Sequence, residues 1–504
     1  IQTDLSGDLL LDSLRNASEI FVPSFKELLA AEPGWEELQD RIFDISLMAY
    51  LINPEERDYG WKRLQMVYLQ QTGVHQDNQG LAVLEIGLYL QNQIQHAGLS
   101  DLLTAIETPL VPVLVKMEKT GLGIDLDAFA GFLTEVENRL QKLTESIYRQ
   151  AGQEFNLRSP QQLAEVLFTR LGLRSKRKTP GGLPSTAVPV LESLCSDHPV
   201  IADILEFRSL EKLRSTYLDP LPRQIGVDGR LHTTFNNLGT ATGRLSSSRP
   251  NLQNIPIRGE FGYRMRSCFV AGQGYTLVAA DYSQIELRLL AHMSRDENLL
   301  LAFSRSEDIH ARTAGLIFDK EPQNITPDER RKAKTINFGL LYGMGPLHLG
   351  RELGLSVREA KKFIEIYFER LHKVRDFYRQ TEQKAREQGY VSTLAGRRRV
   401  LKDLNSRNAN LAAQARRMAI NTVVQGSAAD IIKMAMNRVD RDAELRAFGT
   451  RLVLQVHDEL LLEAPAQKAA AAGRRIASIM SSVAELSVPL DVDWGTGSSW
   501  AEAH

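Results

Sequence analysis

Two segments in the second half of the chain combine buried-strand patterns with an acidic residue where each pattern ends. The segment "YTLVAADYSQIELRLLAHMS" begins with an apolar run from Tyr275 to Ala280, which predicts a buried strand, and changes to helical spacing after Asp281. The segment "RLVLQVHDELLLEAP" predicts two apolar strands separated by a tight turn at His457 and Asp458. We expect the two segments to share one sheet, with both carboxylates at the same edge.

Most of the remaining pattern is helical. The segment "LDAFAGFLTEVENRLQKLTESIYRQ" has apolar residues three and four positions apart and predicts a long exposed helix that stops at Gly152. Another helix is predicted to start after Ser159, because Pro160 takes its first position and Gln162 its third. Residues 1–95 mix the apolar runs "EIFVPSF" and "LMAYLI" with helical stretches such as "LAVLEIGLYLQNQIQ", which indicates a compact α/β layer.

A basic loop rich in Gly and Pro, "SKRKTPGGLPST", occupies residues 175–186. It is either a solvated surface loop or a flexible tip that grips phosphates through Lys176, Arg177 and Lys178. The formal net charge is -1, so the whole-chain charge does not indicate a polyanionic partner. A nucleic-acid surface would therefore have to come from local clusters of this kind.

The composition is that of an ordinary globular protein with several subdomains, because 43% of its 504 residues are hydrophobic and 24% are charged. The two cysteines, Cys195 and Cys268, form no Cys-x-x-Cys motif, which favours a reducing intracellular setting. No apolar run approaches the roughly 18 residues of a membrane span, and the first residues do not resemble a secretion signal. The chain begins with Ile rather than Met, so we expect it to be a piece of something longer.

Asp281 and Asp458 each have an ordinary structural interpretation, as a helix N-cap and as a turn residue. Together they favour metal binding, because carboxylates seldom end apolar strands without a partner. They supply the oxygen ligands that Mg²⁺ prefers. Two such ions about 3.5–4 Å apart can hold the attacking and leaving oxygens of an in-line displacement.

The segment "RRKAKTINFGLLYGMG" predicts a helix with a basic and aromatic face. Residues 326–329, Thr-Pro-Asp-Glu, form a capping box, so the helix begins just before Arg330. Arg330 and Lys334 can hold the triphosphate of a nucleotide, while Phe338 and Tyr342 offer their faces to a sugar and a base. The alternative is a helix packed on a core, with its charged ends extended into solvent.

Five motifs in a fixed order resemble one family. The motifs "TATGRLSSSRPNLQNIP", "DYSQIELRLLAH", "RRKAKTINFGLLYG", "QGSAAD" and "QVHDE" resemble the polymerase part of family A DNA polymerases, the bacterial DNA polymerase I type with its Klenow-like fragment. The resemblance covers residues 100–504 and implies a mixed α/β (α+β) fold of the right-hand polymerase type. The implied domains are a degenerate 3′–5′ exonuclease-like α/β domain at 1–98, a thumb with its connecting segment at 99–240, a palm at 241–300 and 421–504, and fingers at 301–420.

The resemblance also implies a metal site. Asp281, Asp458 and the backbone carbonyl of Tyr282 match the ligands of two Mg²⁺ ions, for which Mn²⁺ can substitute. Glu459 matches an active-site acid whose part in metal binding is less defined. Lys334 matches the family's candidate proton donor to the pyrophosphate leaving group.

Further positions match contacts to nucleotide and DNA. The nucleotide contacts are Arg330, Lys334 and His310 at the triphosphate, Phe338 at the sugar, Tyr342 at the template base, Glu286 as a steric gate against a 2′-hydroxyl, and Gln284. The primer–template contacts are Arg244, Asn251, Gln253, Asn254, Lys212, Arg417, Asn421, Gln425 and His457. Structural alternatives remain open for several of them. Asn421 and Gln425 could cross-link helices, His457 could be a turn residue, and Arg244 could pair with a nearby carboxylate. The segment "GRRR", residues 396–399, is open between a solvated turn and a template-phosphate contact.

The implied activity is that of a DNA-directed DNA polymerase in replication and repair. Its partners would be primer–template DNA and deoxynucleoside triphosphates, without a membrane, and the protein would be a cytoplasmic monomer. A single-subunit RNA polymerase is an alternative, but Glu286 argues against it because that family lacks a carboxylate gate. A catalytically silent DNA-binding protein is a second alternative, and the retained metal ligands argue against it.

Residues 1–95 are not expected to proofread. In the family, the 3′–5′ exonuclease ligands come from Asp-x-Glu, Asn-x-x-x-Asp and Tyr-x-x-x-Asp patterns, and none of these occurs there. Gly87 and apolar neighbours stand where the third pattern requires a carboxylate, and Asp44 resembles a structural position. The early acidic residues are spaced four apart, as on a helix surface, at Asp4, Asp8 and Asp12.

Overall fold

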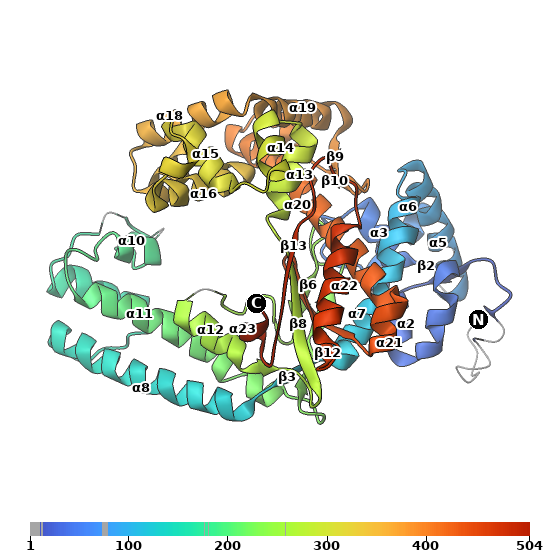
Figure 1. Ribbon diagram of the computed structural model, residues 1–504, viewed down its shortest axis with the longest axis horizontal. Helices are drawn as coiled ribbons and strands as arrows, with labels where there is room; N and C mark the ends of the chain where they lie inside the picture. The colour runs from blue at the N-terminus through green and yellow to red at the C-terminus, as the bar shows by residue number, and fades with distance from the viewer. Residues whose placement is uncertain (1–10, 12–13, 73–78, 176, 180, 258) are drawn as a thin grey trace.

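The computed structural model describes the chain except for residues 1–10, 12–13, 73–78, 176, 180 and 258. Figure 1 shows three groups of helices arranged around a central antiparallel sheet, which confirms the predicted mixture of helices and sheet. The predictions for Asp4, Asp8, Asp12 and Lys176 lie outside the described residues.

The central sheet has four strands in the order β11-β12-β8-β13, and each neighbouring pair is antiparallel. The predicted strands and the turn at residues 457 and 458 are confirmed, with β8 two residues longer than expected. Leu277 and Ala280 on β8 are fully buried, as is Leu460, which pairs with Ala280. The bounds are Tyr275–Tyr282 for β8, Arg451–Val456 for β11, Glu459–Pro465 for β12 and Val492–Gly497 for β13.

The main hydrophobic core lies between this sheet and its helices. Helix α22, Ala469–Ser481, packs on β8 and β13, and the long helix α20, Ala409–Arg441, packs against α22. A Cβ atom on Gly473 would lie 2.2 Å from the Trp494 ring, so only glycine permits this close approach of α22 and β13. The predicted boundary between residues 420 and 421 falls inside α20. Short elements complete this part at α21, Ala443–Phe448, and α23, Trp500–Ala503.

The region predicted as the thumb is built on two long helices that pack together, α8, Leu126–Ala151, and α11, Val200–Leu213 (Figure 1). The predicted end of α8 is confirmed, because Gly152 adopts a left-handed φ of 68° there. One face of α8 is buried, so the helix is exposed only in part. The start after Ser159 is also confirmed, since its hydroxyl accepts from the Gln162 amide. The other elements here are β3 at Leu122–Ile124, α9 at Pro160–Ala164, α10 at Val188–Glu192, β4 at Arg230–Leu231, β5 at Thr234–Asn236, β6 at Ser246–Ser248, α12 at Gly259–Ser267 and β7 at Phe269–Val270.

The region predicted as the fingers is helical. Helix α13, Ile285–Ser294, follows β8 almost directly, and α15 packs along α16. The capping box that starts α16 is confirmed, because Thr326 and Glu329 bond reciprocally. The remaining bounds are α14 at Glu297–Ser304, α15 at Ile309–Phe318, α16 at Pro327–Leu341, α17 at Pro346–Leu353, α18 at Val357–Arg370, α19 at His372–Gln388, β9 at Tyr390–Ser392 and β10 at Arg398–Val400.

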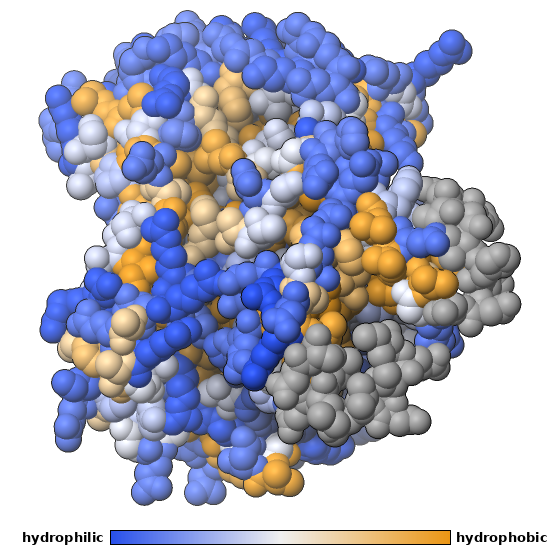
Figure 2. Space-filling model, turned by 90° about the vertical axis from the view of Figure 1, so that its right-hand side faces the viewer, coloured by the Kyte–Doolittle hydropathy of each residue, from blue (hydrophilic) through white to orange (hydrophobic). Residues whose placement is uncertain are grey.

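The N-terminal region has its own hydrophobic core and is mainly helical in its described part. Its described sheet consists of two short parallel strands, and "LMAYLI" lies in helix α3. The expected α/β layer is therefore reduced to one strand pair, and the core continues to Val115, beyond the predicted boundary at residue 98. Figure 2 shows apolar side chains on this side of the molecule. The exposed large apolar residues of the N-terminal region include Met66, Leu84 and Leu88. The bounds are β1 at Ile20–Val22, α2 at Phe25–Ala31, β2 at Ile42–Asp44, α3 at Ile45–Ile52, α4 at Trp61–Thr72, α5 at Gln79–His96, α6 at Ser100–Leu102 and α7 at Thr108–Thr120.

No single helix among the described residues has the length and apolar composition of a membrane span. One pair of helical segments, Gln79–His96 and Ser100–Thr120, passes that test together but is bent by 115°.

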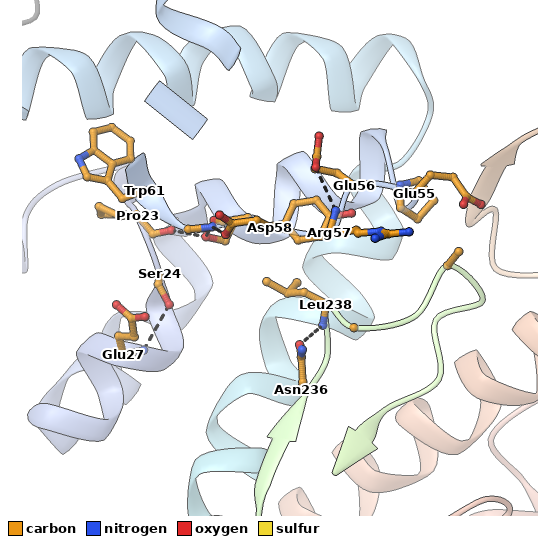
Figure 3. Close-up of a pocket in the computed structure, with 16 residues that line it drawn as sticks. Pro23, Ser24, Glu27, Glu55, Glu56, Arg57, Asp58, Trp61, Asn236 and Leu238 are labelled. Carbon is orange, nitrogen blue, oxygen red and sulfur yellow. Dashed lines mark hydrogen bonds between the residues drawn. The ribbon is translucent and has the colours of Figure 1, made fainter. Parts of the chain in front are cut away.

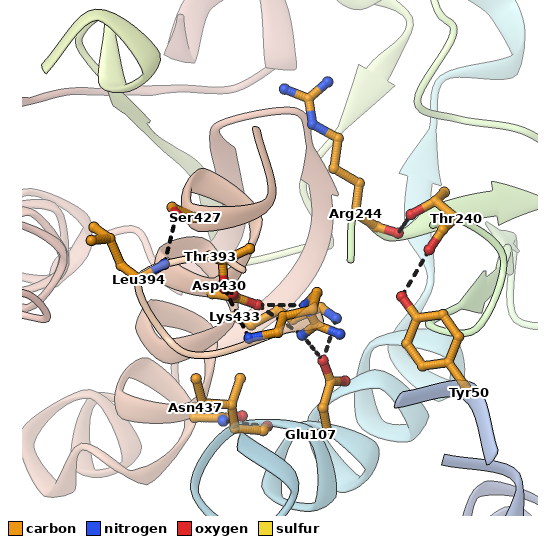
Figure 4. Close-up of polar contacts among 12 residues, drawn as sticks. Tyr50, Glu107, Thr240, Arg244, Thr393, Leu394, Ser427, Asp430, Lys433 and Asn437 are labelled. Carbon is orange, nitrogen blue, oxygen red and sulfur yellow. Dashed lines mark hydrogen bonds and ion pairs between the residues drawn. The ribbon is translucent and has the colours of Figure 1, made fainter. Parts of the chain in front are cut away.

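A buried ion cluster joins three distant parts of the chain (Figure 4). Glu107, just before α7, accepts from Lys433 of α20 at 2.7 Å and from Arg397 of the β9–β10 loop. Arg397 also donates to Asp430 of α20 at 2.7 Å, and Asp430 accepts from Thr393 at 2.6 Å. The four charged side chains are at most 2% exposed.

This cluster overturns both interpretations of the "GRRR" segment for its first arginine, Arg397. Arg397 is neither solvated nor placed to meet a template phosphate, because it is buried against two carboxylates. Burial alone would raise the pKa of Glu107, but the charges of Lys433 and Arg397 lower it below its ordinary value. Glu107 is therefore ionised at neutral pH, and each charge in the cluster depends on its partners.

We expect Glu107→Gln to lower the free energy of unfolding by about 3–5 kcal/mol, because it leaves buried cations without their shared partner. Glu55→Gln is the matched control, since the Glu55 side chain is 46% exposed in its pair with Arg399 and should contribute less than about 1 kcal/mol. Urea unfolding followed by circular dichroism measures both. The depressed pKa means that the wild-type advantage is present above the ordinary carboxyl pKa and is lost as the pH falls through the lowered one. Equal losses in the two variants would contradict the assigned importance of the cluster.

Candidate active site

The two candidate metal-binding carboxylates meet at one end of the central sheet, as expected. Asp281, near the end of β8, pairs with Glu459 on β12 and with Asp493 on β13. The Tyr282 amide donates to the Asp458 carbonyl at 3.2 Å, which brings the turn beside the end of β8. Residues opposite each other in antiparallel strands project to the same face, so acidic groups flank Asp281 on both sides. The flanking residue Asp493 was not anticipated, because its segment carries no strong strand pattern.

These acidic groups repel one another. Burial raises the pKa of Asp281 to about 7, and the charges of Asp458 and Glu459 add to the effect. Burial also raises the pKa of Asp458. A divalent cation would relieve this repulsion, and the two carboxylates with the Tyr282 carbonyl are the hard oxygen donors that such a cation takes. The described residues contain no group of three or more His, Cys, Asp or Glu side chains suited to a metal. The candidate ligands are therefore these two carboxylates and one backbone carbonyl.

Glu459 is already bonded within the protein. Its Oε1 accepts from Trp500 Nε1 at 2.8 Å and lies 3.6 Å from His504 Nδ1. Arg266 stacks over the Trp500 ring at 4.0 Å and lies 3.7 Å from Glu459 Oε2. Glu459 thus anchors the C-terminal residues beside the carboxylates, a contact that its sequence position did not reveal.

Two residues beside the carboxylates have left-handed backbones. Gln284 has φ 55° where it caps α13, and His457 has φ 53° in the turn before Asp458. Such a conformation costs a residue with a side chain roughly 1–2 kcal/mol. The sequence gives no sign of it, because neither position is Gly or Asn. Two of the six described non-glycine residues with positive φ thus lie beside the carboxylates.

Glu286 connects helix α13 to the end of helix α16. Its Oε1 accepts from Arg244 Nη2 and its Oε2 accepts from the Tyr342 hydroxyl, each at 2.6 Å. Burial raises the pKa of Glu286, although Tyr342 and Arg244 oppose the rise. The pairing that was left open for Arg244 is therefore present. The three predicted residues form one hydrogen-bonded unit.

The predicted triphosphate residues lie on α15 and α16. Arg330 Nε pairs with Asp308 Oδ2 at 2.6 Å, while Lys334 is exposed. His310 is 2% exposed, and its ring centroid lies 5.6 Å from that of Phe338. Burial lowers the pKa of His310 to about 4, with Asp308 opposing the shift and both cations adding to it. The imidazole is therefore neutral at physiological pH.

The candidate DNA contacts are spread over several elements. Arg417, Asn421 and Gln425 are spaced four apart along α20, which places them along one side of that helix. The Asn421 Oδ1 atom is buried without a hydrogen-bond partner among the described residues, so it is free to accept from a ligand. Gln253 Nε2 donates to the Gln455 carbonyl at 3.1 Å. The exposed members of the set are Lys212, Asn251, Asn254, Arg417 and His457.

A pocket lies between the N-terminal region and residues 236–241. It has a volume of about 580 Å³ and carries several acidic residues in its wall, and Figure 3 shows Glu27, Asp58 and Glu55 at separate parts of it. Glu55 pairs with Arg399 at 2.7 Å, and Asp58 accepts from the Gly60 amide at 2.8 Å. These acids are dispersed and have local roles.

Asp44 has the structural role that was expected of it. Its carboxylate accepts from the Phe25 and Leu47 amides at 2.8 and 3.0 Å and caps helix α3. Burial raises its pKa to about 6. Both oxygens are thus used within the N-terminal core.

Comparison with known proteins assigns the chain to a family. Residues 127–502 match the family model described as DNA polymerase family A. The chain belongs to DNA polymerase family A. Within this family, the thermostable DNA polymerase I of Thermus filiformis is 48% identical over 400 residues, which cover 79% of this chain and 48% of the relative. The DNA polymerase I of Treponema pallidum is 41% identical over 492 residues, covering 93% and 49%.

The chain spans about half the length of the curated family A relatives that it matches. A solved structure of similar fold is described as the POL domain of Pol1 from M. smegmatis in complex with DNA primer-template and dNTP. It matches with a TM-score of 0.86 and 39% identity, over 91% of this chain and 82% of that one. The family resemblance of the motifs therefore extends to the fold.

The strain at Gln284 predicts an unusual response to glycine. Gln284→Gly should leave the free energy of unfolding unchanged or raise it by up to about 1 kcal/mol, because glycine adopts the left-handed region without steric cost. Gln141→Gly, on an exposed position inside α8, is the matched control and should lower the free energy of unfolding by about 1 kcal/mol. Denaturant unfolding curves compare the two. A similar loss in both variants would show that the Gln284 backbone is not strained.

Proposed function

We propose that this protein carries out template-directed DNA synthesis, adding deoxynucleotides to a primer 3′-hydroxyl with release of pyrophosphate. The observation that carries the proposal is the placing of Asp281 and Asp458 side by side at the sheet end. Helix α16 is tied to the same place through the bond from Tyr342 to Glu286, five residues beyond Asp281. A carboxylate pair beside a basic and aromatic helix suits the joining of a nucleotide triphosphate to a hydroxyl.

The family supports this proposal. The relatives are named DNA polymerase I, and the solved structure from M. smegmatis is described as bound to primer-template and dNTP. By analogy the partners of this chain are primer–template DNA and deoxynucleoside triphosphates. We further propose a monomer that acts in replication and repair in the bacterial cytoplasm or nucleoid, because the relatives are bacterial enzymes.

Family A polymerases depend on divalent metal, and Mg²⁺, with Mn²⁺ as a substitute, is the ion we propose here. Asp281, Asp458 and the Tyr282 carbonyl would hold two such ions. The ions would supply a more acidic primer hydroxyl and neutralisation of charge at the phosphates. Glu459 would support the site indirectly, through the C-terminal residues that it binds.

The remaining roles fall to the side chains around the nucleotide. Arg330, Lys334 and His310 would bind the triphosphate, and Lys334 would donate a proton to the leaving pyrophosphate. Phe338 would pack on the sugar. These groups lie on α15 and α16, so closure of the two helices over the nucleotide would complete the site.

Other residues would select the nucleotide and hold the duplex. Glu286, fixed by Arg244 and Tyr342, would occupy the space that a 2′-hydroxyl needs, and this disfavours the alternative of an RNA polymerase. Tyr342 would guard the template-base position, and Gln284 would line the nucleotide site. The duplex would be held mainly through its backbone and minor groove. The proposed contacts are Lys212, Arg244, Asn251, Gln253, Asn254, Arg417, Asn421, Gln425 and His457.

Asp281→Asn and Asp458→Asn test the proposal directly. Each should lower the single-turnover rate of primer extension by at least about a hundred-fold, because metal charge stabilisation is worth several kcal/mol. Primer–template affinity should stay within a few-fold, since it depends on dispersed phosphate contacts. Asp376→Asn, at an exposed position on α19, is the control and should behave as wild type. A wild-type protein without extension activity would refute the proposal, as would an active-site variant that keeps a tenth of the rate.

We also propose that the protein does not proofread. The N-terminal acids have local roles: Asp44 caps α3, and the acids of the pocket in Figure 3 are dispersed. A 3′-mismatched, end-labelled primer with Mg²⁺ or Mn²⁺ and no nucleotides should therefore keep its length. Shortening that persists through purification and disappears when the exposed acids Glu27, Glu55 and Asp58 are changed to amides would show that a nuclease site exists in this region.

A further inference from the structure

A buried chain of hydrogen bonds between α15 and α16 ends on His310. The Thr313 hydroxyl lies 2.8 Å from the Ile309 carbonyl, and Asn337 Nδ2 lies 3.0 Å from Thr313 Oγ1 and 3.1 Å from His310 Nδ1. The side chains of His310, Thr313 and Asn337 belong to residues at most 2% exposed. Bulk water has little access to these groups, so each must satisfy the others.

The direction of each bond follows from counting hydrogens. The Thr313 hydroxyl has one hydrogen, and the Ile309 carbonyl at 2.8 Å is a better acceptor than Asn337 Oδ1 at 3.3 Å. Thr313 Oγ1 must therefore accept from the Asn337 amide, and the nearer of the two amide atoms, at 3.0 Å against 3.3 Å, is Nδ2. The second amide hydrogen then points to His310 Nδ1. A ring nitrogen that accepts carries no proton, so the neutral imidazole carries its proton on Nε2.

The surroundings keep this imidazole neutral. Asp308 on its own helix is the acidic group facing it, while Arg330 and Lys334 of α16 are the cations, and the apolar Phe338 ring packs beside it. Burial and the two cations disfavour a third positive charge there. Among the described residues Nε2 has no hydrogen-bond partner, which leaves it available to a ligand.

We propose that Asn337 is a positioning residue that holds His310 as the Nε2–H tautomer, so that the imidazole donates a hydrogen bond to the triphosphate of the incoming nucleotide. This inference rests on the proposed function, because it assumes that the ligand is a nucleotide triphosphate. In the opposite tautomer a lone pair on Nε2 would face the phosphate oxygens and repel them. Asn337 acts through His310 and does not itself touch the nucleotide.

The tautomer can be observed without any turnover. Nitrogen NMR of protein labelled at the imidazole nitrogens distinguishes protonated from unprotonated ring atoms, and the His310→Gln spectrum identifies this signal among the 10 histidines. At pH 7.5 we expect Nδ1 unprotonated and Nε2 protonated. The reverse pattern, or an imidazolium, would overturn the inference.

Asn337→Asp reverses the donor while keeping the shape of the side chain. A carboxylate can only accept, so at high pH it would draw the single imidazole proton to Nδ1 and leave Nε2 bare. One further proton on the pair restores Nε2–H, whichever of the two groups holds it. The KM for deoxynucleotide should therefore rise about ten-fold or more at pH 9 and approach the wild-type value towards pH 6.5, with wild type measured at each pH.

Control variants separate positioning from simple packing. In His310→Gln the amide donor does not depend on a tautomer, so adding Asn337→Asp should change KM by less than about two-fold and add no pH dependence. Thr313→Val, which removes the anchor of the amide, should raise KM and weaken the Nε2–H signal. Thr335→Val is its match on α16, where the hydroxyl bonds only the Arg331 carbonyl, and should leave KM unchanged.

Each result decides the inference. A KM increase that is the same at pH 6.5 and pH 9, or that persists in the His310→Gln background, would assign Asn337 a merely structural role. If Asn337→Asp fails to fold, as thermal melting would show, Thr313→Val and the wild-type spectrum carry the test. A wild-type protein that does not extend a primer would remove the proposed function, whereas the imidazole spectrum would still decide the tautomer.

Discussion

The register of β8 against its two neighbours is the constraint on which the site depends. Side chains alternate along a strand, so a slip of one residue would turn Asp281 to the other face of the sheet. The slip is prevented by burial, because Leu277 and Ala280 are fully buried along with Leu460 opposite. The packing of apolar residues thus fixes where the carboxylates emerge. Glu286 lies in the first turn of α13, just after β8. Its position, and therefore its hydrogen bonds to Arg244 and Tyr342, also depends on the register of β8.

Much of this arrangement could be predicted from local patterns. The strands, the turn at Asp458 and the capping box of α16 could be predicted because each depends on residues only a few positions apart in the sequence. Other features depend on contacts with residues far away in the sequence, which local patterns do not reveal. Arg397 looked like a surface residue within "GRRR", yet Glu107 lies 290 positions away and Asp430 lies 33 positions away. The left-handed Gln284 was equally hidden, because only the surrounding packing imposes it.

The N-terminal region shows why short apolar runs mislead. "LMAYLI" has the composition of a strand, but neighbouring helices bury it on all sides as α3, and a run of that length fits either structure. The region is also bonded to the rest of the protein. The Tyr50 hydroxyl donates to the Thr240 carbonyl at 2.8 Å, and the Thr240 hydroxyl donates to the Arg244 carbonyl at 2.8 Å (Figure 4). A region without a nuclease role would still support the loop that carries Arg244.

The buried ion cluster constrains how this sequence can change over evolutionary time. The cluster holds four charged residues, and removing any one of them leaves a buried charge without a partner. Four apolar residues of similar total volume could be as stable in the same place. Each single substitution on the way between these two solutions leaves an unpaired charge, and only the joint loss of an ion pair, such as Glu107 with Lys433, avoids it. A route made of single substitutions must therefore pass through sequences of low folding stability. The effects of substitutions at the four positions on the free energy of unfolding are strongly non-additive. The four residues can therefore be retained during evolution because each single change is destabilising, even where an apolar core would be more stable.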